Sequence, residues 1–237
     1  MPSPMPASIA EPLRHPVEAV IAAIETDVIR GRILPRTRLI EDHLMEDYGA
    51  KRHVVRAALA ELERLGVVIK PRHRGAEIRR FDADQLEQLY ATRAVLHRAA
   101  VAMMRLPPDP NALAALELAL LAHEQASAKG DLIAIHRSNM AFHRQLYGLC
   151  ENQYLAESIR LHDWLSFPVR AYGVADPHAL RQACEEHARM VEAVRQADSA
   201  SLDMLSVEHM GKARRIYEAK FLLPLEGSRA PTTVGNP

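Results

Sequence analysis

The stretch YGAKRHVVRAALAELERLGVVIKPRHRGAEI, residues 48–78, decides the fold of the first third of the chain. Apolar residues recur at helical spacing between Lys51 and Leu65, which predicts an amphipathic helix that Gly66 ends. β-branched residues follow, and then Pro-Arg-His-Arg-Gly leads into a second short run that contains Ile78. This pattern predicts a β-hairpin with a basic tip directly after the helix.

Two more helices are predicted upstream, over 17–31 and 41–49, and a short extended link over 32–40 joins them. Helix, helix, short turn, helix and hairpin is the order of a winged helix-turn-helix. In that arrangement the helix after the turn lies in the major groove of DNA, and the hairpin, or wing, touches the backbone or the minor groove.

The distribution of charge supports a negatively charged partner for this region. The whole chain balances 30 Lys and Arg against 30 Asp and Glu, so its net charge gives no indication of a partner. Between Lys51 and Arg80, however, nine Lys and Arg stand against three acidic residues. Such a local excess suggests contact with a polyanion near the N-terminal third.

The remainder of the chain predicts a helical bundle. Six helices and no strand are expected after Asp82, with Pro168 kinking or fraying the fourth: 83–104, 109–129, 131–149, 152–170, 176–197 and 199–222. The fold class is therefore mainly α, with an N-terminal winged helix-turn-helix and a C-terminal all-helical antiparallel bundle. The expected divisions are a flexible N-terminus over 1–15, the winged helix over 16–80, the bundle over 81–223 and a flexible tail over 224–237.

Residues 31–78 resemble the DNA-binding domain of GntR-type bacterial transcription regulators. The matching positions are Gly31, Pro35, Leu39, Glu41, Leu44, Gly49, Arg52, Val55, Arg56, Ala58, Leu59, Leu62, Glu63, Leu65, Gly66 and Gly75. The family's usual Ser-Arg-Thr-Pro is Lys-Arg-His-Val at 51–54, and Ala57 stands where the family has a glutamate. The resemblance implies DNA binding, but these departures mean that the operator sequence does not carry over.

The later helices resemble the all-helical FCD effector domain of the FadR subfamily. The segments that carry this likeness are LYATRAVLHRAAVAMM (89–104), NMAFHRQLYGLCENQYL (139–155), EEHARMVEAVRQAD (185–198) and VEHMGKA (207–213). The two resemblances together cover about residues 20–222. Six helices, with none added between wing and bundle, favour the VanR-like branch.

The candidate DNA-binding residues gather on the predicted third helix, the wing and the extended link. Arg52 and Arg56 are four apart and so share one helical face, where arginine can pair bidentately with guanine. Link and wing residues suit phosphates. The full set is Arg36, Arg38, Lys51, Arg52, His53, Arg56, Arg72, His73, Arg74 and Gly75. A solvated basic face is the alternative, and the winged-helix order argues against it.

Three histidines fall on the apolar stripes of three different bundle helices, which predicts that they meet in the interior. They are His143, His187 and His209, and Asn139 lies one turn before the first. Imidazoles with an oxygen ligand suit a divalent transition metal such as zinc, nickel or manganese. The FCD resemblance implies the same set, although many members have Asp in place of Asn139. A polar effector pocket without metal is the alternative.

Arg93 lies on the inward stripe of the first bundle helix, where a buried guanidinium needs an anionic partner. The resemblance implies that Arg93 faces the pocket and pairs with the carboxylate of an effector, and a structural ion pair is the alternative. His97 and Asn139 are further effector-binding candidates, though His97 could equally serve packing. His123, His136, His162 and His178 are expected at surface or edge positions, and Trp164 in the core or the pocket wall.

The expected protein is a cytoplasmic transcription regulator that works as a homodimer. Its partners are a double-stranded, palindromic DNA operator and a small-molecule carboxylate. The resemblance favours a repressor, the commoner mode in such families, and the sequence itself leaves activator or repressor open. Only two cysteines and a Pro-rich start without an apolar core argue against secretion. The absence of a run of about 18 apolar residues argues against membrane insertion. The sequence contains no motif such as His-Glu-x-x-His that would place a general base beside the metal, which argues against a metal-dependent enzyme. The inward polar residues argue against a purely architectural DNA-binding protein.

Overall fold

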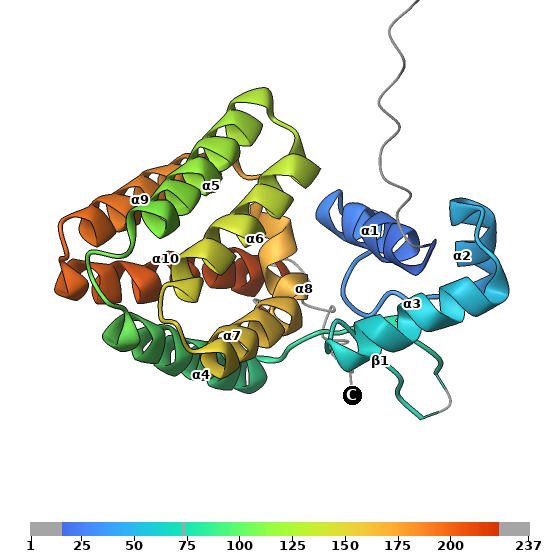
Figure 1. The fold of residues 1–237 in the computed structure, drawn as a ribbon. Helices are drawn as coiled ribbons and strands as arrows, with labels where there is room; N and C mark the ends of the chain where they lie inside the picture. Colours follow the sequence, from blue (N-terminus) through green and yellow to red (C-terminus); the bar gives the residue numbers. More distant parts are fainter. Residues whose placement is uncertain (1–15, 73, 223–237) are drawn as a thin grey trace, which may run out of the picture.

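The computed structural model describes residues 16–72 and 74–222, and Figure 1 shows a small N-terminal unit beside a larger helical one. The termini predicted to be flexible, 1–15 and 224–237, lie outside the described residues, and so does His73. None of the described helices is long and apolar enough to cross a membrane.

The N-terminal unit has the predicted winged-helix order. Its elements are α1 (Pro16–Ile29), α2 (Glu41–Tyr48), α3 (Arg52–Arg64), β1 (Val68–Ile69) and β2 (Glu77–Ile78). Gly49 ends α2 with φ of 60°, and this left-handed conformation makes the tight turn that leads into α3. The helix-turn-helix therefore depends on a glycine at a position that L-residues adopt with difficulty.

The hairpin is short, and the link before α2 adds to its edge. β1 and β2 are antiparallel, with Val68 opposite Ile78 and Ile69 opposite Glu77. Arg38 forms an isolated bridge with Glu77, so the link predicted as extended chain lies along the outer side of β2. This pairing brings the basic link to the base of the wing.

The larger unit is the predicted helical bundle, with ends close to those expected from the sequence. It comprises α4 (Ala83–Met103), α5 (Pro110–Lys129), α6 (Leu132–Gly148), α7 (Gln153–Leu165), α8 (Phe167–Arg170), η1 (Ala171–Gly173), α9 (Pro177–Arg195) and α10 (Ser199–Phe221). An Asp or Asn caps the start of each long helix by accepting hydrogen bonds from backbone N–H groups: Asp82, Asp109, Asp131, Asn152, Asp176 and Asp198. These caps explain why the breakers in the sequence locate the boundaries well.

The helix predicted over 152–170 is two helices. α7 ends at Leu165, and α8 begins at Phe167 with Pro168 in its first turn. Proline has no N–H to continue the helical ladder, so the chain changes direction at Ser166. The predicted kink is confirmed, but the prediction of one continuous helix was wrong.

The two units share a hydrophobic core. One cluster of buried residues combines Ile24 and Leu62 of the winged helix with Leu86, Phe167 and Tyr217 of the bundle. A hydrogen bond crosses the same junction: the Tyr172 hydroxyl donates to the Ile33 carbonyl at 3.1 Å. The winged helix is thus packed against the bundle rather than tethered to it.

Candidate functional site

The first candidate site is the exposed face formed by α2, α3 and the hairpin. Arg52 and Arg56 lie one turn apart at the start of α3, and both pair with acids at the start of α2. The Nη1 atom of Arg52 lies 3.3 Å from Glu41 Oε2, and its Nη2 donates to Asp42 at 2.6 Å. Arg56 donates through Nε to the same Glu41 oxygen at 2.8 Å. The preceding helix therefore holds both arginines.

A groove of about 540 Å³ separates this helix pair from the hairpin. Its charged lining consists of Arg38, Glu41, Arg56, Lys70 and Arg74, and Gly75 completes it on the wing side. Four of these five charges are positive, so the groove attracts an anionic partner.

Every predicted DNA-binding residue that the structure describes is exposed: Arg36, Arg38, Lys51, Arg52, His53, Arg56, Arg72, Arg74 and Gly75. His73 is outside the described part of the chain. Arg36 has φ of 67°, and its backbone N–H donates to the Ile78 carbonyl at 2.9 Å. Arg36 and Arg38 thus belong to the wing side of the face, a placement that depends on strand pairing.

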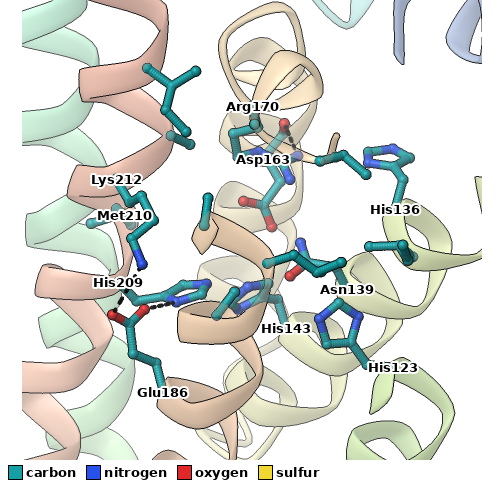
Figure 2. A pocket seen from close by; sticks show the side chains of 18 of the residues that line it. His123, His136, Asn139, His143, Asp163, Arg170, Glu186, His209, Met210 and Lys212 are labelled. Carbon is teal, nitrogen blue, oxygen red and sulfur yellow. Dashed lines mark hydrogen bonds and ion pairs between the residues drawn. The ribbon is translucent and has the colours of Figure 1, made fainter. Parts of the chain in front are cut away.

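The second candidate site is a cavity of about 100 Å³ inside the bundle, shown in Figure 2. His143 of α6 is buried there, and His209 of α10 is partly buried. His187 of α9 has no exposed surface, and its ring centroid lies 5.1 Å from that of His143. Each offers one ring nitrogen, and these atoms lie within 4.8 Å of one another. The predicted meeting of three histidines from three helices is confirmed.

The geometry of the three histidines fits a metal ion. The Nε2 atoms of His187 and His209 are 3.1 Å apart, close to the ~3.3 Å expected between two imidazole nitrogens on one tetrahedral ion. His143 Nδ1 and His187 Nδ1 are buried without a hydrogen-bond partner among the described residues. Burial also holds the pKa of His143 and of His187 well below the usual range, which keeps both rings neutral, the form that binds metal.

Glu186 orients the third histidine, and the sequence-based reasoning missed it. The ring of His209 donates from Nδ1 to Glu186 Oε2 at 2.7 Å, so its Nε2 lone pair points toward the other two histidines. Burial raises the pKa of Glu186, but the contacts with His209 and Lys212 outweigh burial and lower it overall. Glu186 lies three residues after Ala183 and four before Met190, a helical spacing that could have revealed it.

Asn139 lines the same cavity, and Figure 2 shows it on α6 together with His143. The oxygen ligand predicted from the sequence therefore lies on the wall of the cavity. Its amide carries no charge, so an ion held here would keep one more positive charge than with an aspartate at this position.

Arg93 is buried at the edge of the cavity and forms the ion pair that was the alternative interpretation. Its Nη2 donates to Asp163 Oδ1 at 2.7 Å. Arg170 also approaches Asp163, whose backbone carbonyl accepts from Arg170 Nη2 at 2.8 Å. The Nε and Nη1 atoms of Arg93 remain buried without a partner within the described chain. Arg93 is thus partly satisfied and keeps two donor nitrogens without a hydrogen-bond partner.

His97, the second effector candidate on α4, lies in a polar cluster on the cavity wall. Its Nδ1 is 2.8 Å from the Tyr147 hydroxyl and 3.3 Å from the Ser206 carbonyl. Burial lowers the pKa of His97 to about 3, and the nearby charge of Arg93 contributes. His97 is therefore a neutral hydrogen-bonding group of the pocket wall.

Two histidines expected at the surface are buried in the cavity wall, so that prediction was wrong. His123 is 1% exposed, and burial lowers its pKa to about 4. His136 is 4% exposed. His123 follows the buried Leu116 by two turns, and His136 precedes Asn139 by three residues on the same stripe. Helical spacing therefore carried the signal for both. His162 is partly buried and His178 is exposed.

Charges around the cavity favour an anionic ligand. Arg93, Arg170 and Lys212 face it, against the carboxylates of Asp163 and Glu186. The Nζ atom of Lys212 is buried without a hydrogen-bond partner among the described residues, and burial lowers the pKa of Lys212. Asp163, Arg170 and Lys212 were not predicted. Asp163 is an acid one turn after the buried Ile159, and that spacing was a usable signal.

Trp164, expected in the core or the pocket wall, is partly buried and packs against the larger core cluster. It lines a second, wider groove between α6 and α7.

Comparison with known proteins agrees with this geometry. The domain family described as bacterial regulatory proteins, gntR family, matches residues 16–78, and the FCD domain family matches residues 88–212. The uncharacterized HTH-type transcriptional regulator YdhC of Bacillus subtilis (strain 168) is 25% identical over 184 residues, covering 77% of this chain and 82% of YdhC.

Solved structures of similar proteins show the same fold. McbR/YncC of E. coli matches with a TM-score of 0.70 at 23% identity, covering 88% of this chain and all of that one. A transcriptional regulator GntR from Rhodococcus sp. RHA1 matches with a TM-score of 0.67 at 20% identity, covering 86% of this chain and 98% of that one. The exposed basic winged helix, the histidine pocket and both family matches lead to one conclusion: the chain belongs to the GntR family of bacterial transcription regulators, with a C-terminal FCD domain.

Proposed function

We propose that this DNA-binding regulator is a repressor that binds a palindromic operator as a homodimer and loses operator affinity when a small carboxylate occupies the histidine pocket. The observation that carries the proposal is a pocket residue that also contacts the winged helix. His136 lines the pocket, and its Nε2 lies 3.8 Å from Glu25 of α1 in the winged helix. A change at the pocket therefore has a direct route to the DNA-binding unit.

The exposed face of α3 and the wing supports a major-groove mode of binding. Arg52 and Arg56 would contact base edges, with Lys51 and His53 beside them. The residues of the link and the wing would contact the phosphate backbone of the DNA, because basic side chains and a glycine that permits close approach suit phosphates. They are Arg36, Arg38, Arg72, His73, Arg74 and Gly75.

The pocket supports a divalent transition metal such as zinc, nickel or manganese held by Asn139, His143, His187 and His209. Metal binding is known for FCD domains. When bound, the ion would offer open positions to carboxylate oxygens. A metal-free pocket in which Arg93 and Lys212 alone bind the ligand is the second candidate.

The effector would be a small carboxylate. Two nitrogens of Arg93 and the Lys212 ammonium are buried at the cavity without a hydrogen-bond partner among the described residues, and Lys212 has only a 3.9 Å ion pair with Glu186. A cavity of about 100 Å³ is smaller than the roughly 300–1,000 Å³ of sites for drug-sized ligands, which favours an acid of few atoms. Burying these donors costs free energy until an anion satisfies them.

The homodimer would form through α4 and α7. Val95 and Met103 of α4 and Tyr154 of α7 are large apolar residues that remain exposed. The Asn152 amide lies 3.8 Å from Met103 Sδ, so the end of α4 and the start of α7 are adjacent. An isologous pair of such faces would give the two-fold symmetry that a palindromic operator requires. Val95→Glu should then convert the dimer to monomers in light scattering.

Metal analysis and calorimetry test the pocket. The full chain should bind one divalent metal per protomer, and His143→Ala should abolish this, whereas the exposed His178→Ala should not. Arg93→Lys keeps the charge beside Asp163 but loses the guanidinium fork, and it should weaken binding of small carboxylates. Unchanged metal and carboxylate binding in both pocket variants would refute the assignment.

Mobility-shift assays test the DNA face. The probe is the DNA upstream of the protein's own gene, against random DNA of equal length. Arg56→Ala should lose specific binding by about 1–3 kcal/mol. A reporter joined to the same DNA should be repressed, and release by an added carboxylate should disappear in the pocket variants. A variant Arg56→Ala that bound both DNAs unchanged would refute the major-groove placement.

A further inference from the structure

We infer that Glu41 is a specificity-determining positioning residue of the DNA-reading face, because it holds Arg56 in a geometry ready to read a guanine. The inference rests on the proposed placement of α3 in the major groove. It assigns different tasks to two arginines that the sequence makes equivalent, Arg52 and Arg56.

Arg56 is held in a way that leaves its reading end free. The contact with Glu41 Oε2, at 2.8 Å, uses the Nε atom alone. The two terminal nitrogens have no carboxylate partner among the residues that the structure describes. End-on pairing with guanine O6 and N7 needs those two terminal nitrogens. Arg56 can therefore contact a guanine while its ion pair with Glu41 stays intact.

Arg52 is held in the opposite way. Its terminal nitrogens are both occupied, Nη1 by Glu41 at 3.3 Å and Nη2 by Asp42 at 2.6 Å. Arg52 must exchange these contacts before it can bind DNA with its guanidinium fork. Asp42 is the outer partner, with a side chain 70% exposed, so this exchange is easy in water.

The position of Glu41 explains why its pair with Arg56 would persist on DNA. Glu41 is the first residue of α2 and the only carboxylate among the described residues that line the groove between α3 and the hairpin. Arg38, Lys70 and Arg74 surround it there. DNA that covers the groove would exclude water and strengthen the contact between Glu41 and Arg56. A fixed arginine also loses less side-chain freedom when it binds a base.

The same charges do little for folding. Exposed ion pairs contribute little to stability, because water screens them and ordering two side chains costs entropy. The contribution of the ion pair between Glu41 and Arg56 should therefore be measurable in DNA selectivity rather than in the melting temperature.

The experiment starts with selection of preferred duplexes from a random library by the full wild-type chain. Affinity is then measured for the selected duplex and for a shuffled duplex of the same composition. Glu41→Ala should lower the ratio of the two affinities about fivefold to a hundredfold, the worth of one bidentate base contact. Repeated selection with Glu41→Ala should relax the guanine position that Arg56→Ala relaxes. Glu41→Gln keeps an oxygen for Arg56 Nε and should recover part of the ratio.

Two control variants separate positioning from charge. Glu46→Ala removes a negative charge from an exposed position of the same helix, and should raise affinity for both duplexes without changing their ratio. Asp42→Asn frees Arg52 from one carboxylate, and should raise affinity for DNA while keeping the guanine preference that Arg56 sets. The double variant Glu41→Ala with Arg56→Ala should be no less selective than Arg56→Ala alone, since Glu41 acts through Arg56.

Failure of this inference and failure of the proposed function would give different results. If Arg56→Ala leaves every base preference unchanged, the major-groove placement fails and the inference fails with it. If Arg56→Ala relaxes a guanine but Glu41→Ala retains it at the wild-type ratio, only the inference is overturned. Selectivity lost equally in Glu46→Ala and Glu41→Ala would also overturn it, because the effect would then be one of charge.

Discussion

Two arginine–carboxylate pairs of nearly equal length have very different surroundings in this protein. Arg56 and Glu41 are joined at 2.8 Å on the winged helix, with side chains 62% and 32% exposed. Arg93 and Asp163 are joined at 2.7 Å beside the pocket, with side chains 4% and 9% exposed. Burial rather than distance distinguishes the two pairs.

The difference shows what each region is suited to do. Water screens an exposed pair, so the pair contributes little to the stability of the fold. A buried pair holds its geometry, because separating the charges leaves one of them without water or a partner. The winged helix thus exposes charges that matter more for DNA binding than for folding, whereas the bundle buries a charge pair that fixes the wall of its cavity.

The largest expected effect comes from breaking the buried pair. Asp163→Ala should lower the free energy of unfolding by about 3–5 kcal/mol, because Arg93 then stays buried without its partner. Glu41→Ala should lower it by less than about 1 kcal/mol. Urea unfolding of the full chain measures both.

A double variant distinguishes charge from packing in this comparison. Arg93→Met combined with Asp163→Leu removes both charges and keeps apolar volume, and it should regain most of the stability that Asp163→Ala loses. Equal losses in the free energy of unfolding for Asp163→Ala and Glu41→Ala would show that burial does not make the two ion pairs differ in their contribution to stability.

The next effect concerns the junction between the two regions. Gly66 ends α3 with φ of 77°, and a Cβ built there would lie 2.6 Å from Cδ1 of Leu165 on α7. Gly66→Ala should therefore lower the free energy of unfolding by about 1–3 kcal/mol, through left-handed backbone strain and this close contact. Thermal unfolding of the full chain measures the change.

Gly148→Ala is the matched control for the junction. Gly148 lies at the end of α6, and a Cβ there would meet nothing within 4 Å. This control should be neutral or slightly stabilising, since alanine favours helix more than glycine does. A loss in Gly148→Ala as large as that in Gly66→Ala would show that the junction is not special.

The smallest effect is the response of a buried histidine to pH. The pKa of His97 is lowered to about 3 in the folded protein, from 6.5. As pH falls below 6.5 the unfolded chain binds a proton at this residue and the folded chain does not, so stability falls. Between pH 6.5 and pH 5.5 His97 should contribute a loss of about 1 kcal/mol.

Removing the histidine isolates its contribution. His97→Gln should reduce the loss of stability over this pH interval by about 1 kcal/mol relative to wild type. Urea unfolding at both pH values, with a chelator present throughout, keeps any metal from contributing. An identical pH dependence in wild type and variant would mean that His97 titrates equally in both states.

Local sequence patterns predicted most of the fold. Apolar spacing and breakers located the winged helix and six bundle segments, because helices depend on neighbours three and four residues apart. The exception was α7 and α8, where the direction of the chain after Pro168 depends on packing. The same spacing predicted that His143, His187 and His209 meet, and it could have found His123 and His136 had their stripes been followed.

The pairing of charges could not be predicted in this way. Arg93 and Asp163 are 70 residues apart, and Glu41 and Arg56 are 15 residues apart on different helices. No periodicity links such residues. A sequence-based reading could therefore place Arg93 on an inward face without deciding whether its partner was an effector or Asp163.

The sequence by itself thus determined the helices, the winged-helix order, the basic face and the three inward histidines, because local hydrogen bonding and amphipathic spacing set these features. Only the tertiary structure decided that Glu41 holds Arg56, that Asp163 neutralises Arg93, and that His136 lies against Glu25 between the two units. Each of these contacts joins residues distant along the chain. The packing of whole helices and the burial of shared apolar surface bring such residues together.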